Sequence, residues 1–177
     1  MTEIRPERFA HIVIRTNRFR ETVEWYRTVL HAWPAFENDF LAFITYDDEH
    51  HRLAFVNTPD APDPGPESAG VDHFAYTYAT LGDLMHTYER LKAEGITPVW
   101  TINHGPTTSL YYSDPNGIRV ELQIDNFERV EDLHEWFRTP AFAQNPIGVE
   151  FDPDVLLARY REGLTREDLQ DRNVLAA

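Results

Sequence analysis

The residues best suited to chemistry in this chain are its eight histidines, because the 177-residue sequence contains no cysteine. Without cysteine there is no disulfide, no thiolate metal ligand and no cysteine nucleophile. The histidines are His11, His31, His50, His51, His73, His86, His104 and His134. A bound metal ion would therefore be held by some of these imidazoles together with aspartate or glutamate.

Two of the histidines occupy equivalent positions of an internal repeat. His11 and His73 each lie in a strand-like run that is followed by a helix-like run. Tyr88 follows His73 at the same spacing at which Tyr26 follows His11. A single histidine in such a run is more often a strand residue with satisfied hydrogen bonds than a ligand. Histidines at matched positions of a repeat instead favour two modules arranged around one shared metal ion.

A carboxylate partner comes from the last strand-like run, which alternates between apolar and polar residues. The apolar set is Ile118, Val120, Leu122 and Ile124, and the polar set is Arg119, Glu121, Gln123 and Asp125. The apolar face is expected to pack on helices, while Glu121 lines the hollow of a curved sheet; the alternative is a solvated strand glutamate. Two imidazoles and one carboxylate on one side of a metal form the facial triad of non-haem Fe(II) oxygen chemistry. We therefore predict that His11, His73 and Glu121 are metal ligands.

A longer pattern surrounds this glutamate and favours the functional interpretation. The pattern is His104-x5-Leu110-Tyr111-x2-Asp114-Pro115-x-Gly117-x3-Glu121, and a second block upstream is His50-His51-Arg52-Leu53-Ala54-Phe55. The first block matches the signature of type I extradiol ring-cleavage dioxygenases of the vicinal oxygen chelate superfamily. The second resembles the strand that carries the acid–base histidine of those enzymes. Over residues 7–126 the chain is similar to the small one-domain members of this family.

The resemblance implies a role for each matching residue. His11, His73 and Glu121 fall where the family binds iron, so we expect Fe(II), with Mn(II) as the alternative. His51 falls on the catalytic acid–base histidine, a role that suits an imidazole because it titrates near neutrality. Its neighbour His50 competes for this role, because adjacent strand residues face opposite sides. The resemblance favours His51.

His104 and Tyr111 fall on the pair that hydrogen-bonds the bound catechol, so the resemblance implies that both are catalytic and both bind substrate. It further implies cleavage of an aromatic ring beside its hydroxyl groups. Both atoms of O2 would enter a hydroxymuconic semialdehyde-type product. The expected substrate is a 2,3-dihydroxybiphenyl-like diol, and a substituted monocyclic catechol such as L-DOPA remains open.

Periodicity and turn residues predict the elements that must position these side chains. Strands are expected over residues 9–15, 40–46, 51–56, 71–78, 98–102, 109–112 and 118–124, and helices over 21–30 and 81–94. The pattern predicts an α+β fold in which two βαβββ modules form a curved mixed sheet around one metal site. Appended C-terminal helices are expected over 131–137 and 152–162.

These elements also suggest how the chain is organised. We expect one domain over residues 1–126, built from modules over about 7–57 and 71–126. The linker between them, residues 58–70, carries four Pro and two Gly. Residues 127–177 are expected to form a C-terminal helical extension.

The composition of the chain limits which classes of partner it can bind. The 16 Lys and Arg residues are outnumbered by 30 Asp and Glu, which gives a net charge of −14 and argues against nucleic acid or an anionic membrane surface as a partner. The apolar runs are too short for a membrane span, and the N-terminus does not resemble a secretory signal. We therefore expect a cytoplasmic homo-oligomer whose partners are a small aromatic diol and O2.

Two other functions are compatible with the superfamily. A glyoxalase-like lyase or isomerase commonly takes a fourth protein ligand from the last strand of the first module, but that strand, residues 52–57, contains no carboxylate or Gln. A non-catalytic binding or resistance protein would not need the predicted catalytic residues. We expect no site role for His31, His86 or His134, and we expect the acidic run 47–49 to be a solvated turn.

Overall fold

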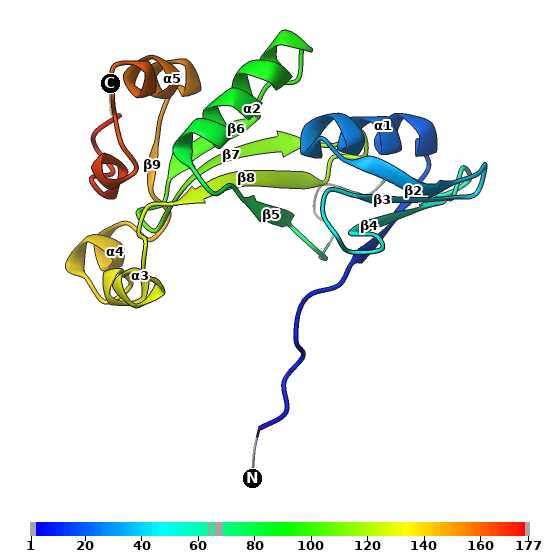
Figure 1. The fold of residues 1–177 in the computed structure, drawn as a ribbon, viewed down its shortest axis with the longest axis horizontal. Coiled ribbons are helices and arrows are strands. Elements are labelled where there is room, and N and C mark those ends of the chain that lie inside the picture. Colours follow the sequence, from blue (N-terminus) through cyan, green and yellow to red (C-terminus); the bar gives the residue numbers. More distant parts are fainter. Residues whose placement is uncertain (1–2, 64, 66–68, 176–177) are drawn as a thin grey trace. The chain divides into compact units, whose positions relative to one another are not determined.

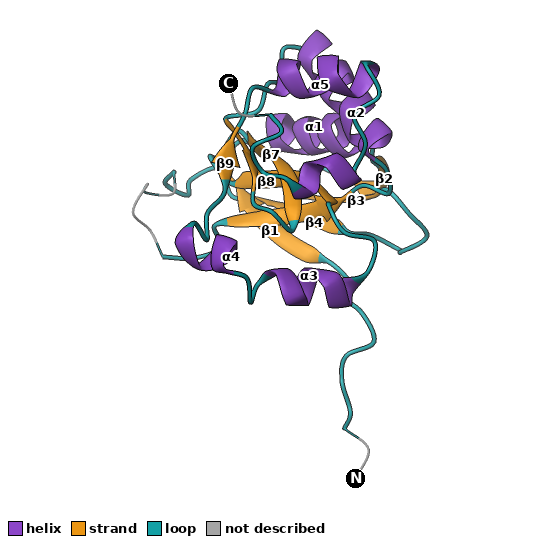
Figure 2. Ribbon diagram, turned by 90° about the vertical axis from the view of Figure 1, so that its left-hand side faces the viewer, coloured by secondary structure: helices purple, strands orange, loops and turns teal. Residues whose placement is uncertain are grey.

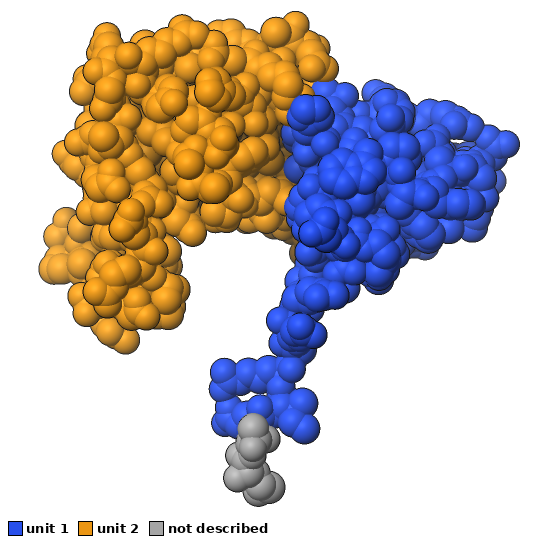
Figure 3. All heavy atoms as spheres, viewed as in Figure 1, with its two compact units in different colours: residues 1–69, 114–117 blue, residues 70–113, 118–177 orange. Residues whose placement is uncertain are grey.

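The computed structural model describes residues 3–63, 65 and 69–175, so residues 64 and 66–68 of the predicted linker lie outside the described residues (Figure 1). Helices and strands are both present in each half of the chain (Figure 2). The chain divides into two compact units (Figure 3). Unit 1 is residues 1–69 and 114–117, and unit 2 is residues 70–113 and 118–177. Each unit contains one copy of the repeat.

Unit 1 is a four-stranded mixed sheet with one helix. Its elements are β1 (Ile12–Thr16), α1 (Phe19–Leu30), β2 (Trp33–Glu37), β3 (Leu41–Thr45) and β4 (Leu53–Asn57). The strand order is β1-β4-β3-β2, with β1 parallel to β4 and the other neighbours antiparallel. The buried stripe of α1, which includes Val23, Tyr26 and Val29, packs towards β4.

The strand β2 was not assigned from the sequence. All five of its residues are exposed, so it lacks the alternation that identifies a half-buried strand. Its pairing with β3 shifts register between Pro34 and Phe36, because proline cannot donate a ladder hydrogen bond. An exposed, irregular edge strand leaves little pattern in the sequence.

The predicted turn over residues 114–117 belongs to unit 1. Tyr26 donates its hydroxyl proton to Asp114 over 3.2 Å, and Asn116 donates to the side chain of Asn17 over 2.7 Å. Gly117 has φ 86°, a conformation that glycine adopts without strain. The Asp-Pro-Asn-Gly sequence therefore forms a turn whose side chains bind the first helix of the chain and the loop before it.

Unit 2 is a five-stranded mixed sheet with the second repeat helix and the C-terminal extension. Its repeat elements are β5 (His73–Thr77), α2 (Leu81–Ala93), β6 (Trp100–Asn103), β7 (Thr107–Ser113) and β8 (Arg119–Asp125). The extension adds α3 (Val130–Trp136), α4 (Pro140–Gln144), β9 (Val149–Glu150), α5 (Pro153–Arg161) and the 3-10 helix η1 (Glu167–Gln170). The strand order is β5-β8-β7-β6-β9, and among the described strands of this sheet the β5–β8 pair is parallel and the other neighbouring pairs are antiparallel.

The two faces of the unit 2 sheet differ. Val120, Leu122 and Ile124 are buried on the face that packs towards α2, as the alternation of β8 predicts. The helix α5 packs against α2 on the same side, whereas α3 and α4 lie on the other side of the sheet (Figure 1, Figure 2). That other face carries three of the predicted site residues, His73, Tyr111 and Glu121.

The predicted fold class is confirmed, with two βαβββ modules and appended helices. Thr80 caps α2 by accepting the Asp83 N–H over 3.1 Å, and Gly95 ends it with φ 78°. The extension also contains α4, β9 and η1, which the sequence did not reveal because each spans five residues or fewer. Among the described residues, no helix is long and apolar enough to cross a membrane.

Candidate metal and substrate site

The sheet of unit 2 places three of the predicted site residues on one face. Glu121 on β8 is in register with Tyr111 on β7, and Tyr111 is in register with Trp100 on β6. Residues in register on neighbouring strands project to the same face. His73 on β5 is in register with Arg119, which lies two residues from Glu121 and therefore shares its face. Strand pairing thus gathers residues that are distant in sequence.

His73 and Glu121 form a close pair on this face. The His73 Nε2 atom lies 3.0 Å from a carboxylate oxygen of Glu121, which is 4% exposed. The other ring nitrogen, Nδ1, lies 2.6 Å from a carboxylate oxygen of Asp72, which also accepts a hydrogen bond from Arg119. Metal-binding histidines commonly use their second nitrogen in this way, because a carboxylate fixes the ring orientation and raises its basicity. The pair therefore fits two neighbouring ligands of a divalent metal.

Tyr111 lies next to this pair and contacts a further predicted residue. Its ring centroid is 5.3 Å from that of His73, and its hydroxyl is 3.0 Å from the Nε2 atom of His104. Burial, followed by the negative charge of Glu121, raises the pKa of Tyr111 above its ordinary value. The phenol therefore stays protonated at neutral pH, so that it can donate a hydrogen bond.

Unit 1 brings together the remaining predicted residues. The ring centroids of His11 and His51 are 4.4 Å apart, and His51 stacks on Phe43 at the same centroid distance. The Nδ1 atoms of His50 and His51 are 2.6 Å apart. Burial, followed by the charges of His11 and His50, lowers the pKa of His51 below its ordinary value. A predicted ligand and the predicted acid–base histidine are therefore ring neighbours.

The strand boundaries differ from those expected around these histidines. His11 directly precedes β1, and β4 begins at Leu53, after His50 and His51. The rule that adjacent strand residues face opposite sides therefore does not apply to His50 and His51. Their rings instead meet edge to face, at an interplanar angle of 65°.

The predicted ligand set is divided between the two units. His11 belongs to unit 1, whereas His73 and Glu121 belong to unit 2. Among residues 3–63, 65 and 69–175, no group of three or more His, Asp or Glu side chains is arranged so that it could hold a metal ion. The complete set of His11, His73 and Glu121 stays a prediction, and so do the roles of His51, His104 and Tyr111.

Three residues of the unit 2 face were not singled out as site residues from the sequence. Asp72 supports His73, Arg119 bonds Asp72, and the ring of Trp100 lies 4.8 Å from that of Tyr111. The sequence indicates that Arg119 lies on the same face as Glu121, because the two residues are two positions apart on one strand. Asp72 is adjacent to a predicted ligand, but sequence adjacency does not tell which acidic residue reaches the imidazole.

The acidic run 47–49 is held by ion pairs. Asp47 accepts hydrogen bonds from the Arg52 guanidinium at 3.0 and 3.1 Å, and Glu49 accepts one from Arg8 at 2.9 Å. These pairs neutralise the carboxylates and stabilise the loop that leads to His50 and His51. The run lies in a turn, but it is solvated only in part: Asp48 is exposed, whereas the Glu49 side chain is 7% exposed and pairs with Arg8.

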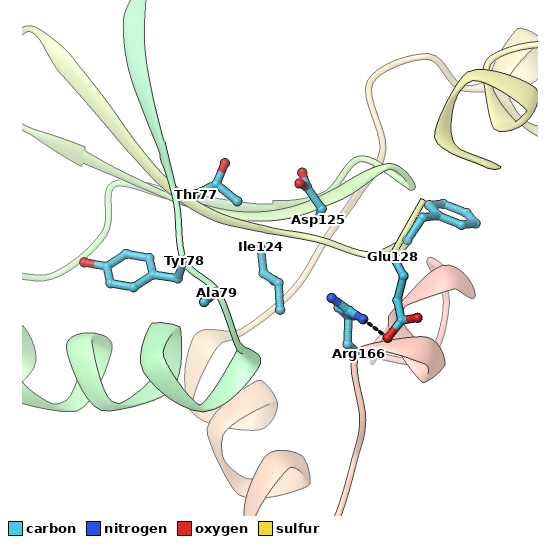
Figure 4. A pocket seen from close by; sticks show the side chains of 8 residues that line it. Thr77, Tyr78, Ala79, Ile124, Asp125, Glu128 and Arg166 are labelled. Carbon is cyan, nitrogen blue, oxygen red and sulfur yellow. Dashed lines mark hydrogen bonds and ion pairs between the residues drawn. The ribbon is translucent and has the colours of Figure 1, made fainter. Parts of the chain in front are cut away.

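A polar pocket of about 290 Å³ opens elsewhere in unit 2 (Figure 4). It is lined by Thr77, Tyr78, Ala79, Ile124, Asp125, Phe127, Glu128 and Arg166. Arg166 and Glu128 form an ion pair of 2.7 Å across it. None of the described residues predicted to be catalytic or to bind metal lines this pocket, so it is distinct from the His73–Glu121 pair.

Comparison with known proteins gives a family and two close relatives. The family model described as "Glyoxalase/Bleomycin resistance protein/Dioxygenase superfamily" matches residues 8–122. Biphenyl-2,3-diol 1,2-dioxygenase 2 of Rhodococcus globerulus is 50% identical over 147 residues, which are 82% of this chain and 77% of that protein. Biphenyl-2,3-diol 1,2-dioxygenase 3 of the same organism is 40% identical over 167 residues, 93% of this chain and 88% of that protein.

Solved structures share the fold at much lower identity. The crystal structure of lactoylglutathione lyase from Agrobacterium tumefaciens matches with a TM-score of 0.54 and 19% identity, over 67% of this chain and 94% of that one. This likeness concerns the fold, because one fold supports several chemistries. The residues of the site and the sequence relatives must therefore distinguish among them.

Proposed function

Because the chain belongs to the glyoxalase/bleomycin resistance protein/dioxygenase superfamily, we propose that it is an Fe(II)-dependent enzyme that cleaves a 2,3-dihydroxybiphenyl-like diol beside its hydroxyl groups. The superfamily and the enzyme class predicted from the sequence are confirmed, since two relatives at 50% and 40% identity are extradiol dioxygenases. The substrate proposed here follows the names of those relatives. A glyoxalase-like lyase and a binding protein are the other candidates that the fold allows.

The observation that carries the proposal is the His73–Glu121 pair. An imidazole and a carboxylate 3.0 Å apart, with the second imidazole nitrogen on Asp72, fit a divalent metal that prefers nitrogen and oxygen ligands. We assign His11 as the third ligand, from its position in the repeat. Iron held by three protein ligands would supply open positions at which a diol and O2 meet.

We assign side chains of both units to the binding of a diol substrate. A diol that binds as its anion must lose a hydroxyl proton, and we assign its acceptance to His51. Nε2 of His51 can accept this proton when its Nδ1 is the donor to Nδ1 of His50, 2.6 Å away. The Tyr111 hydroxyl, kept protonated by its raised pKa, donates a hydrogen bond to a substrate oxygen that gains negative charge. In the chain without substrate Nε2 of His104 lies 3.0 Å from that hydroxyl. When the diol binds, we assign Nε2 of His104 to the hydroxyl of the second diol oxygen in place of this contact.

These roles define the overall reaction. The ring opens at the bond beside the two hydroxyl groups, and both atoms of O2 enter a hydroxymuconic semialdehyde-type product. His51 returns its proton to the oxygenated substrate as the ring opens. We further propose that the protein works as a homo-oligomer in the cytoplasm. Sedimentation of the purified chain tests the oligomeric state, and cell fractionation tests the location.

The test is an anaerobic reconstitution followed by exposure to air. The chain is loaded with Fe(II) or, in parallel, with Mn(II). Each sample is then mixed separately with 2,3-dihydroxybiphenyl, catechol, substituted catechols or L-DOPA. The reaction is measured by O2 uptake and by the yellow colour of the ring-opened product. We expect turnover with Fe(II), fastest with the bicyclic diol. Absence of both O2 uptake and colour across the panel contradicts the proposal. Turnover of a hemithioacetal without O2 uptake would favour the glyoxalase-like alternative.

A further inference from the structure

The C-terminal extension, residues 127–177, contacts the turn that carries His104 at several points. The turn lies between β6 and β7, and the extension returns beside it as β9, which pairs with the end of β6. All of these residues belong to unit 2. None of the residues assigned a role in the proposed function lies in the extension.

The main-chain carbonyl of Ile147 accepts a hydrogen bond from Nδ1 of His104. A carbonyl oxygen can only accept, so the proton must reside on Nδ1. A neutral imidazole carries one proton, and its Nε2 atom is then an acceptor. That Nε2 atom is the one that lies 3.0 Å from the Tyr111 hydroxyl. The extension therefore dictates which nitrogen of His104 faces Tyr111 as an acceptor.

The carbonyl is held in place by the turn that precedes β9. The side chain of Asn145 accepts the N–H groups of Ile147 at 3.2 Å and Gly148 at 2.9 Å, and its amide donates to the Gly148 carbonyl over 2.6 Å. Gly148 has φ 129°, and a Cβ there would lie 2.9 Å from the Cα of His104. Only glycine permits this backbone approach.

Further contacts with the extension hold the turn between β6 and β7, which carries His104. The buried side chains of Asn103 and Asn126 both donate to the carbonyl of Leu169, at 2.7 and 3.2 Å, and Asn103 accepts the N–H of Gly105 over 2.8 Å. Gly105 has φ 104° and lies directly against the ring of Trp136 on α3, where a Cβ has no room. The turn beside His104 is thus enclosed by the extension.

The extension also holds the neighbouring indole. Glu150 on β9 accepts the Trp100 Nε1 proton over 2.7 Å, and the ring of Trp100 lies 5.8 Å from that of His104 and 4.8 Å from that of Tyr111. The imidazole is therefore fixed by a hydrogen bond at one nitrogen and by an aromatic neighbour at its side.

We propose that the C-terminal extension is a positioning element for His104, in which the Ile147 carbonyl holds the imidazole as its Nδ1–H tautomer so that Nε2 accepts from Tyr111. Ile147, Asn145 and Gly148 act through His104 and do not touch substrate. The consequence of this role for catalysis rests on the proposed function, whereas the tautomer itself does not.

The decisive measurement is the tautomer of His104 in the full chain without added metal. Histidine labelled with 15N is observed by long-range 1H–15N NMR at about pH 8, where an ordinary histidine is neutral. His104→Asn identifies the His104 signal by its loss. We expect the Nδ1–H tautomer in the natural sequence. The Nε2–H tautomer would overturn the proposal, whether or not the protein cleaves diols.

Two pairs of variants test the cause. Gly148→Ala displaces the turn by a methyl group, and its control is Gly163→Ala, whose glycine also has positive φ but has open space around its Cβ position. Asn145→Ala removes the bonds that hold the turn without adding an atom, and its control is Asn173→Ala in the same extension. We expect Nε2–H to appear in the first member of each pair and Nδ1–H to persist in both controls. Should both first members keep Nδ1–H, the carbonyl does not set the tautomer and the proposal fails.

Activity then separates positioning from folding and from the proposed reaction. In the iron-loaded enzyme we expect Asn145→Ala to lower kcat by about 10- to 100-fold while iron content stays unchanged, because a displaced catalytic group loses rate without losing the metal. An unchanged kcat together with an altered tautomer would show that His104 does not need this support. If the natural sequence itself turns over no diol, the proposed function fails while the tautomer result stands.

Discussion

The two repeat modules place an equivalent histidine in different surroundings. His11 is exposed and precedes its strand, and its neighbours are the imidazole rings of His50 and His51. His73 is the first residue of its strand, is only partly exposed, and lies between the carboxylates of Glu121 and Asp72. A neighbouring carboxylate orients an imidazole, whereas neighbouring imidazoles disfavour a positive charge. The second module therefore orients its histidine beside a buried carboxylate, and in the first module burial, followed by the neighbouring imidazoles, lowers the pKa of His51.

The equivalent tyrosines of the two repeat helices show the same divergence. Tyr26 donates to Asp114 in the turn 114–117, and Tyr88 donates to Asp154 at the start of α5. Each tyrosine thus ties its helix to a segment that lies outside its own repeat module. One tie is buried and the other is partly exposed, so the two have different expected strengths.

The largest effect is expected from removing a ligand in either module. We predict that His73→Ala and His11→Ala both lose iron and lower kcat/KM by at least about 1,000-fold, since without the metal the open coordination positions are lost. Metal analysis of the reconstituted proteins and O2 uptake measure both quantities. If His11→Ala retains iron at the level of the natural sequence, the repeat equivalence does not extend to metal binding.

The acid–base role that we propose for the first module can be tested by comparing His51 with His50. We predict that His51→Ala keeps iron and diol binding but lowers kcat by about 100- to 10,000-fold, the usual contribution of a general acid–base residue. His50→Ala is the matched control, with a much smaller effect. Anaerobic diol binding and single-turnover kinetics measure the two steps. Loss of iron from the His51 variant would instead make His51 a ligand.

The support of His73 by a carboxylate can be removed without touching the ligand. We predict that Asp72→Asn lowers metal affinity or activity by about 10- to 100-fold, the typical effect of losing the carboxylate partner of a ligating histidine. Asp48→Asn, an exposed aspartate of unit 1, is the control. An unchanged metal affinity, measured by competition with a chelator, would remove the contrast between the two modules.

The tyrosine ties predict a smaller difference in stability. Tyr26→Phe leaves Asp114, which is 4% exposed, with one donor fewer, and we expect it to lower the free energy of unfolding by about 1–3 kcal/mol. Tyr88→Phe should cost only about 0.5–1.5 kcal/mol, because Asp154 keeps Lys92 and solvent as partners. Urea denaturation of both variants gives the comparison, and equal costs would contradict it.

The smallest effect concerns pH. Hydrogen bonds from Lys92, then from Tyr88, hold the pKa of Asp154 below its ordinary value of 3.8. A depressed carboxyl pKa stabilises the fold above the unfolded pKa, and this stabilisation is lost as pH falls through the folded pKa. Since the Asp154 side chain is 54% exposed, we expect less than about 1 kcal/mol. Asp154→Asn should lower Tm at pH 7 but not near pH 2, and an equal loss at both would exclude this linkage.

Most of the fold was predictable because its signals are local. The apolar spacing of α2, the cap at Thr80 and the alternation of β8 each lie within a short stretch of sequence and specify their element directly. The strand β2 and the short elements of the extension were not predictable. Their residues are exposed or too few to show a period, and tertiary pairing holds them in place.

The candidate site, like the fold, was predictable only where its signals are local in the sequence. Residue types and their spacing already indicate the candidate ligands, through matched histidines in a repeat and a motif that ends in Glu121. These suffice for the family and for a predicted ligand set. Sequence spacing does not determine which side chains meet across a sheet, because strand register pairs residues that are far apart along the chain.

Only the tertiary structure therefore decided the partners. It placed Glu121 against His73, chose Asp72 as the support of that imidazole, and brought the Ile147 carbonyl to His104 from the far end of the chain. The tautomer of an imidazole depends on what its second nitrogen meets, and that partner is set by chain return and packing. The residue types limit the chemistry that this protein can perform, whereas the folded chain sets the protonation and orientation of those residues.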